Sequence, residues 1–564
     1  MEPTTTILDV PPDCWKLILS KLHHNHHYYT HILSLTCKQL LTLTNTLPFT
    51  LTLSPPLLPH LPALLRRFST SLHSLSATAT TVSSALSLIV SSAATTHLRC
   101  IHLTDIDSLP IDAIRHLGSN PNAVKLLTLC NIKGLSDDLL VDICVAFPLV
   151  EEIDVSFNDL SDKGILGIAK NLKFLKRVKL SGNVLLTDKS LMALSDCCLD
   201  LEEVEVLGCS VVTQYGIGYV MHRSSKLRRV SMNTLIHSRV EMSNSLFSIE
   251  TSVGFCKNLS NIEFYTMNVD DALLCSIAKA NLPLTSFTAS YCYKVSLSGL
   301  STFLCAYRRL EKLGLEGHVI LTDEAIKGLV CYLGNLVEID LSYCYELTSS
   351  TFQMLVKNCP ALEEIKMECT LLGDGELCEP LVKGDNIRCL KLDSNNRLTD
   401  DMLGKIGLMC PNLVYLDASD CRNLTSEGIR KLVNCCRKLE YLVVAGWKKS
   451  VLFGTGFEDT SYDLEMLQLE DGKFGDECIS AIAKACPKLL YVNLAGCTAL
   501  TSTSVKVLVE NCENLRELNM SRCSNLSSES LAGIVSTRPS LRTITSPIKY
   551  TSTSTGTKLG FFHQ

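Results

Sequence analysis

Several signatures of other protein classes are missing from this chain of 564 residues. No two cysteines have the Cys-x-x-Cys spacing of a zinc ribbon. Lysine and arginine gather only in short clusters such as Arg66-Arg67, which cannot follow a phosphate backbone, and the net charge is −6. The segment Gly454-Thr455-Gly456 is too short for a phosphate-binding loop. We therefore expect no nucleic acid partner, no bound nucleotide and no other cofactor.

Signals for secretion and for membrane insertion are also missing. The first twelve residues lack the basic patch and apolar core of a secretory signal. The longest uncharged stretch, residues 74–96, is about half Ser and Thr, whereas a membrane span needs roughly 20 mostly apolar residues. We expect no membrane partner and a cytoplasmic or nuclear location. The 27 cysteines are then expected to be reduced thiols.

What the chain does contain is a repeat. The pattern apolar-x-x-apolar-x-apolar, as in Leu413, Leu416 and Ala418, recurs every 25 or 26 residues, apart from one 32-residue step after Leu227. A degenerate copy begins at Leu72. The first positions of the 18 regular units are residues 98, 124, 150, 175, 201, 227, 259, 284, 310, 336, 362, 387, 413, 439, 464, 489, 515 and 541. Such a period indicates a solenoid rather than several globular domains.

Each unit predicts a short strand, a turn and a helix. We number positions from the first residue of a unit, so that position +8 is the eighth residue beyond it. Alternating apolar residues predict a strand with every second side chain inward. Position +8 is often Cys or Asn, and a later Ser or Thr, as in Leu186-Thr187, suits a helix N-cap. Cys-Pro, as at Cys359-Pro360, often ends the helix because proline cannot continue it.

This pattern resembles the cysteine-containing leucine-rich repeat. The resemblance implies an α/β solenoid, a leucine-rich-repeat horseshoe with a parallel concave sheet and convex helices, preceded by a small all-α head. The expected parts are the head at 8–45, degenerate first repeats or a linker at 46–97, the solenoid at 98–545 and a disordered tail at 546–564. Cysteines that recur at position +8, or three residues before a first position, are expected to be small buried hydrophobes.

The head carries a second motif, between residues 8 and 41. Apolar residues fall on one face of a helix that begins after Pro-Pro-Asp. A His/Tyr-rich break follows, and no carboxylate lies near its histidines in the sequence, so no metal site is predicted. The segment resembles an F-box. The residues that this resemblance assigns to adaptor binding are Pro11, Pro12, Asp13, Trp15, Ile18, Leu19, Leu22, Leu35, Cys37 and Lys38.

An F-box joined directly to such an array resembles the F-box/leucine-rich-repeat family. The resemblance implies that the head docks on a Skp-family adaptor and cullin of an SCF (cullin-RING) ubiquitin ligase. The repeats then hold the target protein for ubiquitination and proteasomal degradation. Because the chemistry takes place on other subunits, the chain itself is expected to be non-catalytic. Its contribution is proximity and specificity.

Three alternatives remain open. The head can simply cap one end of the solenoid, which such arrays require, and Trp15 can be a core residue. The chain can be a protein-binding scaffold that never enters a ligase. It can also be a thiol enzyme, but this needs a cysteine paired with histidine outside the repeats, and only Cys14 and Cys37 of the head are available.

Positions +2, +4 and +6 should point from the concave face. Across the units they include fourteen acidic residues and six basic ones, which disfavours a polyphosphate ligand. Solvated surfaces also carry many acids, so the excess can be without function. We predict that the target protein presents a basic segment to the middle of this face, around Glu316, Glu338, Asp340, Glu364 and Glu368.

A second substrate anchor is predicted in the C-terminal third. Position +2 is Tyr415, Tyr441, Met466 and Tyr491 in four consecutive units. Trp447 stands where neighbouring units have Cys, and the glycine-broken segment after it cannot be an ordinary helix. Tyrosine and tryptophan are favoured at binding hot spots. In the alternative interpretation, Trp447 fills a gap between units and the tyrosines are ordinary cross-strand neighbours.

Overall fold

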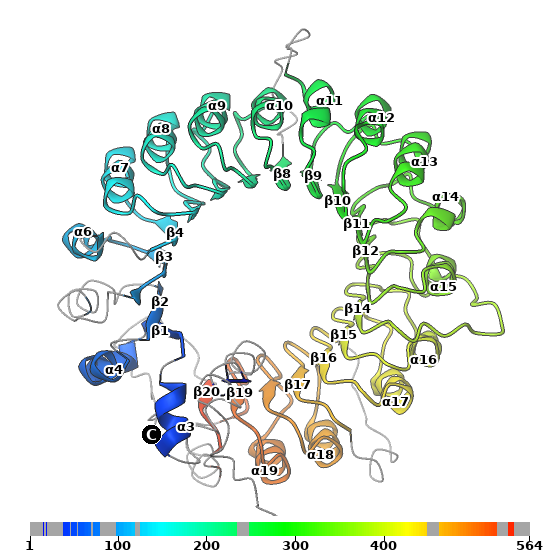
Figure 1. Ribbon diagram of the computed structural model, residues 1–564. Coiled ribbons are helices and arrows are strands. Elements are labelled where there is room, and N and C mark those ends of the chain that lie inside the picture. The colour runs from blue at the N-terminus through cyan, green and yellow to red at the C-terminus, as the bar shows by residue number, and fades with distance from the viewer. Residues whose placement is uncertain are drawn as a thin grey trace, which may run out of the picture. The chain divides into compact units, whose positions relative to one another are not determined.

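The computed structural model describes residues 15, 18–19, 38–45, 47–53, 55–68, 71–78, 89, 97–118, 124–233, 247–447, 462–526, 538 and 540–545. The chain forms two compact units, Met1–Leu259 and Ser260–Gln564. Each unit is a leucine-rich-repeat stack, in which parallel strands lie on the inner side and helices cover the outer side (Figure 1). None of the described helices is long and apolar enough to cross a membrane.

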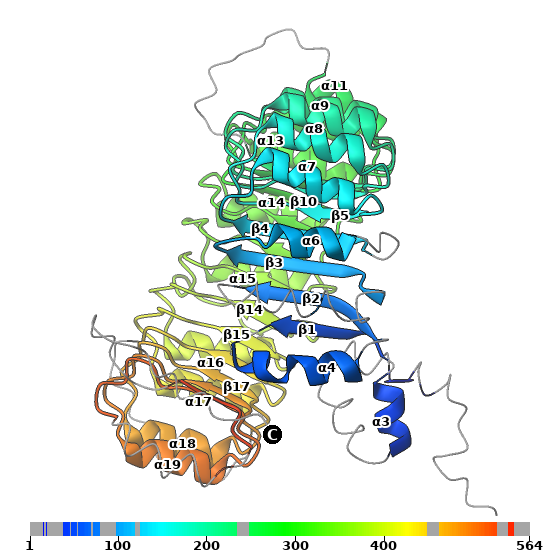
Figure 2. The same ribbon diagram turned by 90° about the vertical axis from the view of Figure 1, so that its left-hand side faces the viewer.

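The first unit is built from strands that pair in parallel in chain order, and Figure 2 shows β1 to β4 stacked in that way. Its strands are β1 (Phe49–Leu53), β2 (Leu72–Thr78), β3 (Cys100–Ile106), β4 (Leu126–Ile132), β5 (Glu152–Asp154), β6 (Arg177–Lys179), β7 (Glu203–Val206) and β8 (Arg229–Asn233). Its helices are α3 (Lys38–Thr44), η2 (Pro55–His60), α4 (Leu61–Arg67), α6 (Ile111–Gly118), α7 (Asp137–Ala146), α8 (Asp162–Asn171), α9 (Asp188–Cys197), α10 (Gln214–Arg223), α11 (Ile249–Ser252) and η4 (Val253–Phe255).

The second unit continues the same architecture. Its strands are β9 (Asn261–Tyr265), β10 (Ser286–Ser290), β11 (Lys312–Gly314), β12 (Glu338–Asp340), β13 (Glu364–Lys366), β14 (Cys389–Lys391), β15 (Tyr415–Asp417), β16 (Tyr441–Val443), β17 (Met466–Gln468), β18 (Tyr491–Asn493), β19 (Glu517–Asn519) and β20 (Thr543–Thr545). Its helices are α12 (Asp271–Ala280), α13 (Leu297–Ala306), α14 (Asp323–Leu329), η5 (Val330–Tyr332), α15 (Ser349–Asn358), α16 (Asp400–Met409), α17 (Ser426–Cys435), α18 (Asp476–Ala485) and α19 (Ser502–Asn511).

The apolar positions of the repeat form the core, as predicted. In the unit that begins at Leu336, the side chains of Leu336, Ile339 and Leu341 are at most 1% exposed. Ile339 of β12 is in register with Leu313 of β11 and Ile365 of β13. The core-facing side chain of each strand therefore packs against the equivalent side chain of the next strand. The hydrophobic core thus runs continuously through the stack.

Position +8 joins consecutive repeats by a buried hydrogen bond. Cys209 donates from Sγ to the carbonyl oxygen of Leu180 over 3.2 Å, and Asn183 donates from Nδ2 to that of Val155 over 3.0 Å. Burial raises the pKa of Cys209 to about 11, so its thiol is protonated at neutral pH. The prediction that cysteines at this position are buried is confirmed, and they pack and donate within the core.

A second set of bonds joins the helix starts. Thr187, the predicted N-cap of α9, accepts a hydrogen bond from the amide of Lys189. Its own amide and hydroxyl both donate to the carboxylate of Asp162, at the start of α8, over 2.9 and 2.6 Å. The same Asp-to-cap pairing recurs in both units, for example between Asp400 and Thr425. Each cap that makes this pairing is thus fixed to the preceding repeat, which helps to set the helix spacing.

Two features differ from the predicted repeat. Residues 46–97, predicted as degenerate repeats or a linker, include β1, which has no counterpart in the predicted pattern and pairs with β2 at the degenerate copy. The repeat that begins at Leu362 has no helix between β13 and β14. Gly373 and Gly375 there have φ of 113° and 80°, which is incompatible with a helix. The predicted strand–turn–helix unit is therefore wrong for this repeat.

Candidate functional site

The concave charges predicted to attract a partner are partly neutralised by ion pairs. In the second unit, the carboxylate of Glu338 forms salt bridges with the ammonium groups of Lys312 and Lys366, at 2.7 and 2.6 Å. Glu364 is in turn 3.5 Å from Lys366 and 3.3 Å from Lys391. The charges of these five side chains alternate between positive and negative from β11 to β14. Glu338 and Glu364, both predicted substrate contacts, therefore already have partners within the fold.

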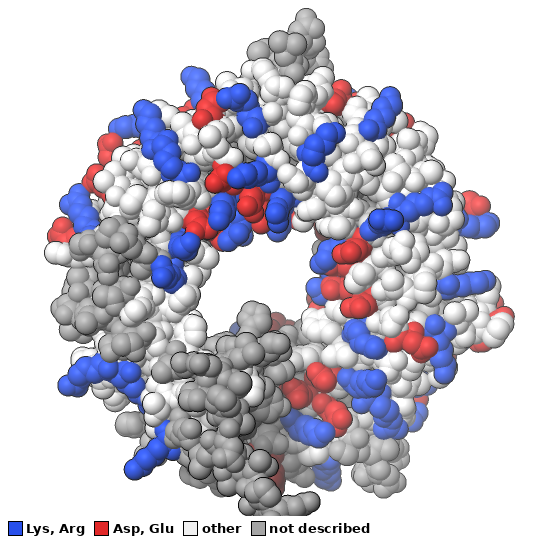
Figure 3. Space-filling model, viewed as in Figure 1, with Lys and Arg blue, Asp and Glu red and all other residues white. Residues whose placement is uncertain are grey.

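The first unit shows the same alternation. Arg177 of β6 pairs with Glu152 of β5 over 2.6 Å, and Lys179 lies 3.7 Å from Glu205 of β7. Basic and acidic side chains are accordingly interspersed along the inner edge of its strands (Figure 3). Counting charges along the sequence therefore exaggerates the acidity that a partner meets on this face.

The acidic excess is concentrated in a smaller group of carboxylates of the second unit. Burial, together with the charges of Asp340, Asp393 and Asp417, raises the pKa of Glu368. Burial also raises the pKa of Glu316, and Asp340 adds to the effect. Neighbouring carboxylates that destabilise one another's ionised form create a locally negative surface, which a cation would relieve. Asp340 also accepts the amide of Ser342 over 3.0 Å.

The four residues at position +2 that were predicted as a second substrate anchor lie side by side in adjacent strands. We call these four residues the tyrosine ladder. Tyr415, Tyr441, Met466 and Tyr491 are paired in sequence across β15 to β18, and all four are partly exposed. The rings of Tyr415 and Tyr441 are stacked, with centroids 6.4 Å apart and planes 30° apart. Burial, aided by Asp417, raises the pKa of Tyr415 to about 12, so the phenol remains a donor. The ladder can present flat aromatic surface, and its role in binding stays a prediction.

Trp447, also predicted as a substrate contact, lies in the interior and is 0% exposed. Its indole N–H donates to the carbonyl oxygen of Ala418 over 2.8 Å, and its ring lies 6.4 Å from that of Phe474. Trp447 therefore fills space between repeats and offers no surface to a partner. The predicted contact is wrong, and for Trp447 the alternative interpretation holds. The glycine-broken segment that follows it lies outside the described residues.

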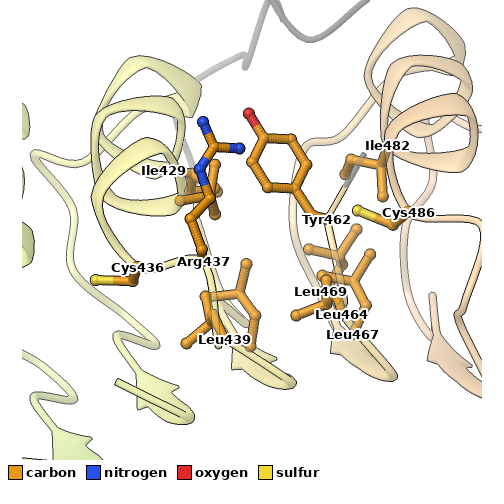
Figure 4. Close-up of a pocket in the computed structure, with 12 residues that line it drawn as sticks. Ile429, Cys436, Arg437, Leu439, Tyr462, Leu464, Leu467, Leu469, Ile482 and Cys486 are labelled. Atoms are coloured by element: carbon orange, nitrogen blue, oxygen red, sulfur yellow. The ribbon is translucent and has the colours of Figure 1, made fainter. Parts of the chain in front are cut away.

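A small cavity lies on the helix side of the same region, between α17 and α18 (Figure 4). Ile429, Ile482 and the leucines of β16 and β17 line it, and its volume of about 20 Å³ suits roughly one water molecule. Tyr462 closes one side, where its hydroxyl donates to Oδ1 of Asn434 over 2.9 Å and Arg437 stacks over its ring at 5.3 Å. The cavity is too small for an organic ligand.

The head is described only in part. Leu19 is fully buried in a cluster with Leu40, Leu43 and Leu47, and Trp15 packs partly buried against it. Ile18 is 43% exposed, and Lys38 at the start of α3 is exposed too. Of the predicted adaptor-binding residues, Leu19 thus belongs to the core of the head and Ile18 to its surface. The remaining residues of the predicted motif lie outside the described part: Pro11, Pro12, Asp13, Leu22, Leu35 and Cys37.

Sequence reasoning missed an exposed aromatic group. The tripeptide Tyr-Cys-Tyr occurs twice, at residues 291–293 and 343–345, in the loops after β10 and β12. Tyr291, Tyr293 and Tyr345 are 39%, 45% and 55% exposed. The repeated tripeptide at positions +7 to +9 was the available signal. Strand alternation predicts the direction of positions +2, +4 and +6 only, and says nothing about the loop beyond them.

The described residues hold no candidate metal-binding group, and two of their buried thiols are protonated. None of their His, Cys, Asp and Glu side chains form a group of three or more that could hold a metal ion. Burial raises the pKa of Cys344 and of Cys359 to about 12, and both thiols are buried. Those two thiols are therefore protonated at neutral pH, unlike an activated nucleophile.

Comparisons with known proteins agree with the repeat architecture. A family model described as Leucine Rich repeat matches residues 148–169. The chain is 27% identical over 224 residues to F-box/LRR-repeat protein 4 of Bos taurus, covering 38% of this chain and 32% of that protein. It is 26% identical over 137 residues to F-box protein SKIP1 of Arabidopsis thaliana, covering 24% and 43%.

A third relative is DNA repair protein RAD7 of Saccharomyces cerevisiae, 24% identical over 320 residues, covering 55% of this chain and 52% of that protein. The chain thus spans between about a third and a half of the length of these relatives. The crystal structure of the Rad7 and Elc1 complex in yeast aligns with a TM-score of 0.41 at 16% identity, covering 72% of this chain and 83% of that one. The chain is a leucine-rich-repeat protein with distant similarity to F-box/LRR proteins and to Rad7.

Proposed function

We propose that this protein is the substrate-recognition subunit of an SCF-type cullin-RING ubiquitin ligase. Its head docks on a Skp-family adaptor, and its repeats hold the target protein for ubiquitination and degradation. The observation that carries the proposal is the F-box-like motif placed directly before the repeats, with Leu19 packed in a small hydrophobic cluster and Ile18 exposed. Distant similarity to two F-box proteins supports it.

The burial of thiols in the repeats supports the proposed division of labour. The repeats present a long polar and aromatic surface but bury the thiols of position +8, which suits binding rather than covalent chemistry. A receptor of this kind raises the local concentration of its target near a catalytic partner. The chain itself is then non-catalytic, and its concave face determines the choice of target.

The experiment is co-purification of the full chain with the adaptor and cullin. Ile18→Asp should abolish co-purification, because it places a charge on an exposed apolar contact. Leu166→Asp is the matched control: Leu166 lies on α8 of the repeats and is 38% exposed, close to the 43% of Ile18. Leu19 must be left unchanged, since a charge at a fully buried residue would unfold the head.

Two outcomes would contradict the proposal. Normal co-purification of the Ile18→Asp variant would show that the predicted face does not contact the adaptor. No adaptor or cullin with the unchanged chain would favour the alternative of a protein-binding scaffold outside any ligase. The Leu166→Asp control guards against a general effect of an exposed aspartate on folding or solubility.

A further inference from the structure

Three tyrosines of the second unit form one aromatic group on the loops that follow the strands. The ring centroids of Tyr291 and Tyr343 are 6.0 Å apart, and Tyr343 meets Tyr345 edge-on at 6.4 Å. The intervening repeat has Gly317 at the position of Tyr291 and Tyr343. A Cβ on Gly317 would stand 2.3 Å from Cδ1 of Tyr291, so only glycine leaves room for this ring. We call Tyr291, Tyr343 and Tyr345 the tyrosine surface.

Apolar side chains extend this surface along the same three repeats. Position +9 is Tyr293, Val319 and Tyr345, and these side chains are 45%, 70% and 55% exposed. Side chains of this size at equivalent positions of consecutive repeats form a strip rather than scattered contacts with water. Exposed apolar strips of this kind indicate an interaction site.

The carboxylate of Glu316 contacts the ring hydroxyl of Tyr291, and the backbone of Glu368 holds the equivalent place beside Tyr343. Oη of Tyr291 donates to Oε1 of Glu316 over 3.0 Å, and its amide donates to the carbonyl oxygen of Glu316 over 2.7 Å. The amide of Tyr343 likewise donates to the carbonyl oxygen of Glu368 over 2.7 Å. Within the described part of the chain, no lysine or arginine forms a salt bridge with either carboxylate. The neighbouring Lys366 is held by Glu338 and Glu364.

We propose that the tyrosine surface, together with Glu316 and Glu368, binds an arginine side chain that is flanked by apolar residues in the target protein. A guanidinium group is planar, stacks on aromatic faces and donates to carboxylates with its edge, whereas the ammonium group of lysine is a compact, strongly hydrated point charge without a flat face to stack. The apolar strip receives the flanking residues. The inference deepens the proposed function, on which it rests, by naming the feature of the target that the repeats recognise.

The backbone of the tyrosine surface supplies a sharp variant. Tyr291 and Tyr343 have φ of 52° and 58°, in the left-handed region that disfavours side chains with a Cβ. Glycine adopts it without strain, and Gly317, Gly446 and Gly496 occupy the same position in other repeats. Tyr291→Gly with Tyr343→Gly therefore removes two rings while relieving backbone strain, so the fold should be retained. Thermal unfolding checks this.

The test uses the full purified chain and a display library of random twelve-residue peptides. We expect the recovered peptides to share an arginine next to apolar residues. A synthetic copy of one such peptide should bind at least about tenfold more weakly when citrulline, which is neutral but similar in shape, replaces the arginine. The Tyr291→Gly, Tyr343→Gly variant should show a similar loss for the arginine peptide.

Phe157→Gly is the matched control in the first unit. Phe157 has φ of 58°, is 62% exposed and lies at the same position of its repeat. This variant should bind the arginine peptide as the unchanged chain does. Peptides without shared arginine, equal affinity for citrulline, or full affinity of the double glycine variant would each overturn the proposal. Dimerisation of the chain through the tyrosine surface, lost in that variant, would overturn it too.

The peptide experiment needs neither adaptor nor cullin, so it separates the two proposals. If the arginine peptide binds and co-purification with the adaptor fails, the surface is correct and the ligase function is wrong. If co-purification succeeds and the peptide measurement fails, the ligase function stands and the target is recognised elsewhere on the repeats.

Discussion

Trp447 donates its indole N–H to the carbonyl oxygen of Ala418 over 2.8 Å. One repeat earlier, Cys421 makes the corresponding bond from Sγ to the carbonyl oxygen of Leu392 over 3.3 Å. A large ring therefore replaces a thiol while the chain of bonds between repeats is preserved. The next repeat has Gly472 at the equivalent position, where a Cβ would overlap the ring of Phe474.

Replacing Trp447 with Ala should destabilise the second unit rather than weaken a partner contact. Loss of a fully buried indole typically costs about 3–5 kcal/mol. Because repeat arrays open locally, hydrogen exchange of the amides of β16 and β17 should accelerate most. Tyr491→Ala, at a partly exposed position nearby, is the control and should change exchange much less. Unchanged exchange in the Trp447→Ala variant would contradict the interior role.

The tyrosine ladder should matter for target binding and not for stability. Replacing Tyr441 and Tyr491 with Ala should weaken binding of a captured target by about 2 kcal/mol or more, since aromatic anchors dominate binding hot spots. Co-purification with the adaptor should be unaffected. Binding can be measured by surface plasmon resonance against the immobilised chain. Unaltered target affinity would place the anchor elsewhere, for instance at the tyrosine surface.

Binding of a basic segment to the concave face should weaken as salt rises, mainly through the association rate. At physiological ionic strength exposed charges are screened over about 8 Å. Glu316→Gln with Glu368→Gln should slow association, because within the described residues no lysine forms a salt bridge with these carboxylates, unlike Glu338. Glu477→Gln on the exposed start of α18 is the control for a surface charge away from the face. Association that is independent of salt would exclude electrostatic steering.

Asp162 should make the first unit sensitive to acid. Burial raises the pKa of Asp162, but the hydrogen bonds from Ser190 and Thr187 outweigh it, so the pKa lies below its usual value. A carboxylate with a lowered folded pKa stabilises the fold above its unfolded pKa of about 4, and this contribution is lost as the pH falls through the folded value. Asp162→Asn should therefore flatten the fall of the melting temperature between about pH 6 and pH 3.

The control for this measurement is Asp138→Asn. Asp138 lies in the preceding helix with its side chain 81% exposed and pairs with Lys163 over 2.7 Å. An exposed ion pair contributes little to stability, so this variant should melt as the unchanged chain does at every pH. Equal acid sensitivity of the Asp162→Asn variant and the unchanged chain would show that the bonds between helix starts contribute little.

The repeat could be predicted from the sequence because it depends on the spacing of residues within each unit. Spacing of apolar residues identified the core positions, and Thr187 was recognisable as a helix cap. The same rule that buries Cys at position +8 also applied to Trp447, but its size suggested a binding role that the structure does not support. The missing helix after β13 left no trace in the spacing, because an irregular segment of equal length preserves the period.

The tyrosine surface could not be predicted from the sequence, for a different reason. A strand alternates its side chains between two faces, so its pattern can be extended residue by residue. At position +7 the backbone enters the left-handed region, as at Tyr291, and the alternation ends there. The direction of the side chains beyond that point depends on the turn and on the neighbouring repeat, as the approach of Tyr291 to Gly317 shows.

The side-chain bonds between repeats have a polarity. Asn183 and Cys421 each donate backwards, and so does the cap at Thr187. Truncation from the N-terminal side would thus strip acceptors from these side-chain donors. Truncation from the C-terminal side would leave carbonyls and carboxylates without a donor, but before an asparagine repeat it would also strip the acceptor from a buried amide, as the bond from the amide of Leu160 to Oδ1 of Asn183 over 3.3 Å shows. A shortened chain that ends just before an asparagine repeat should therefore be less stable than one that ends just before a cysteine repeat.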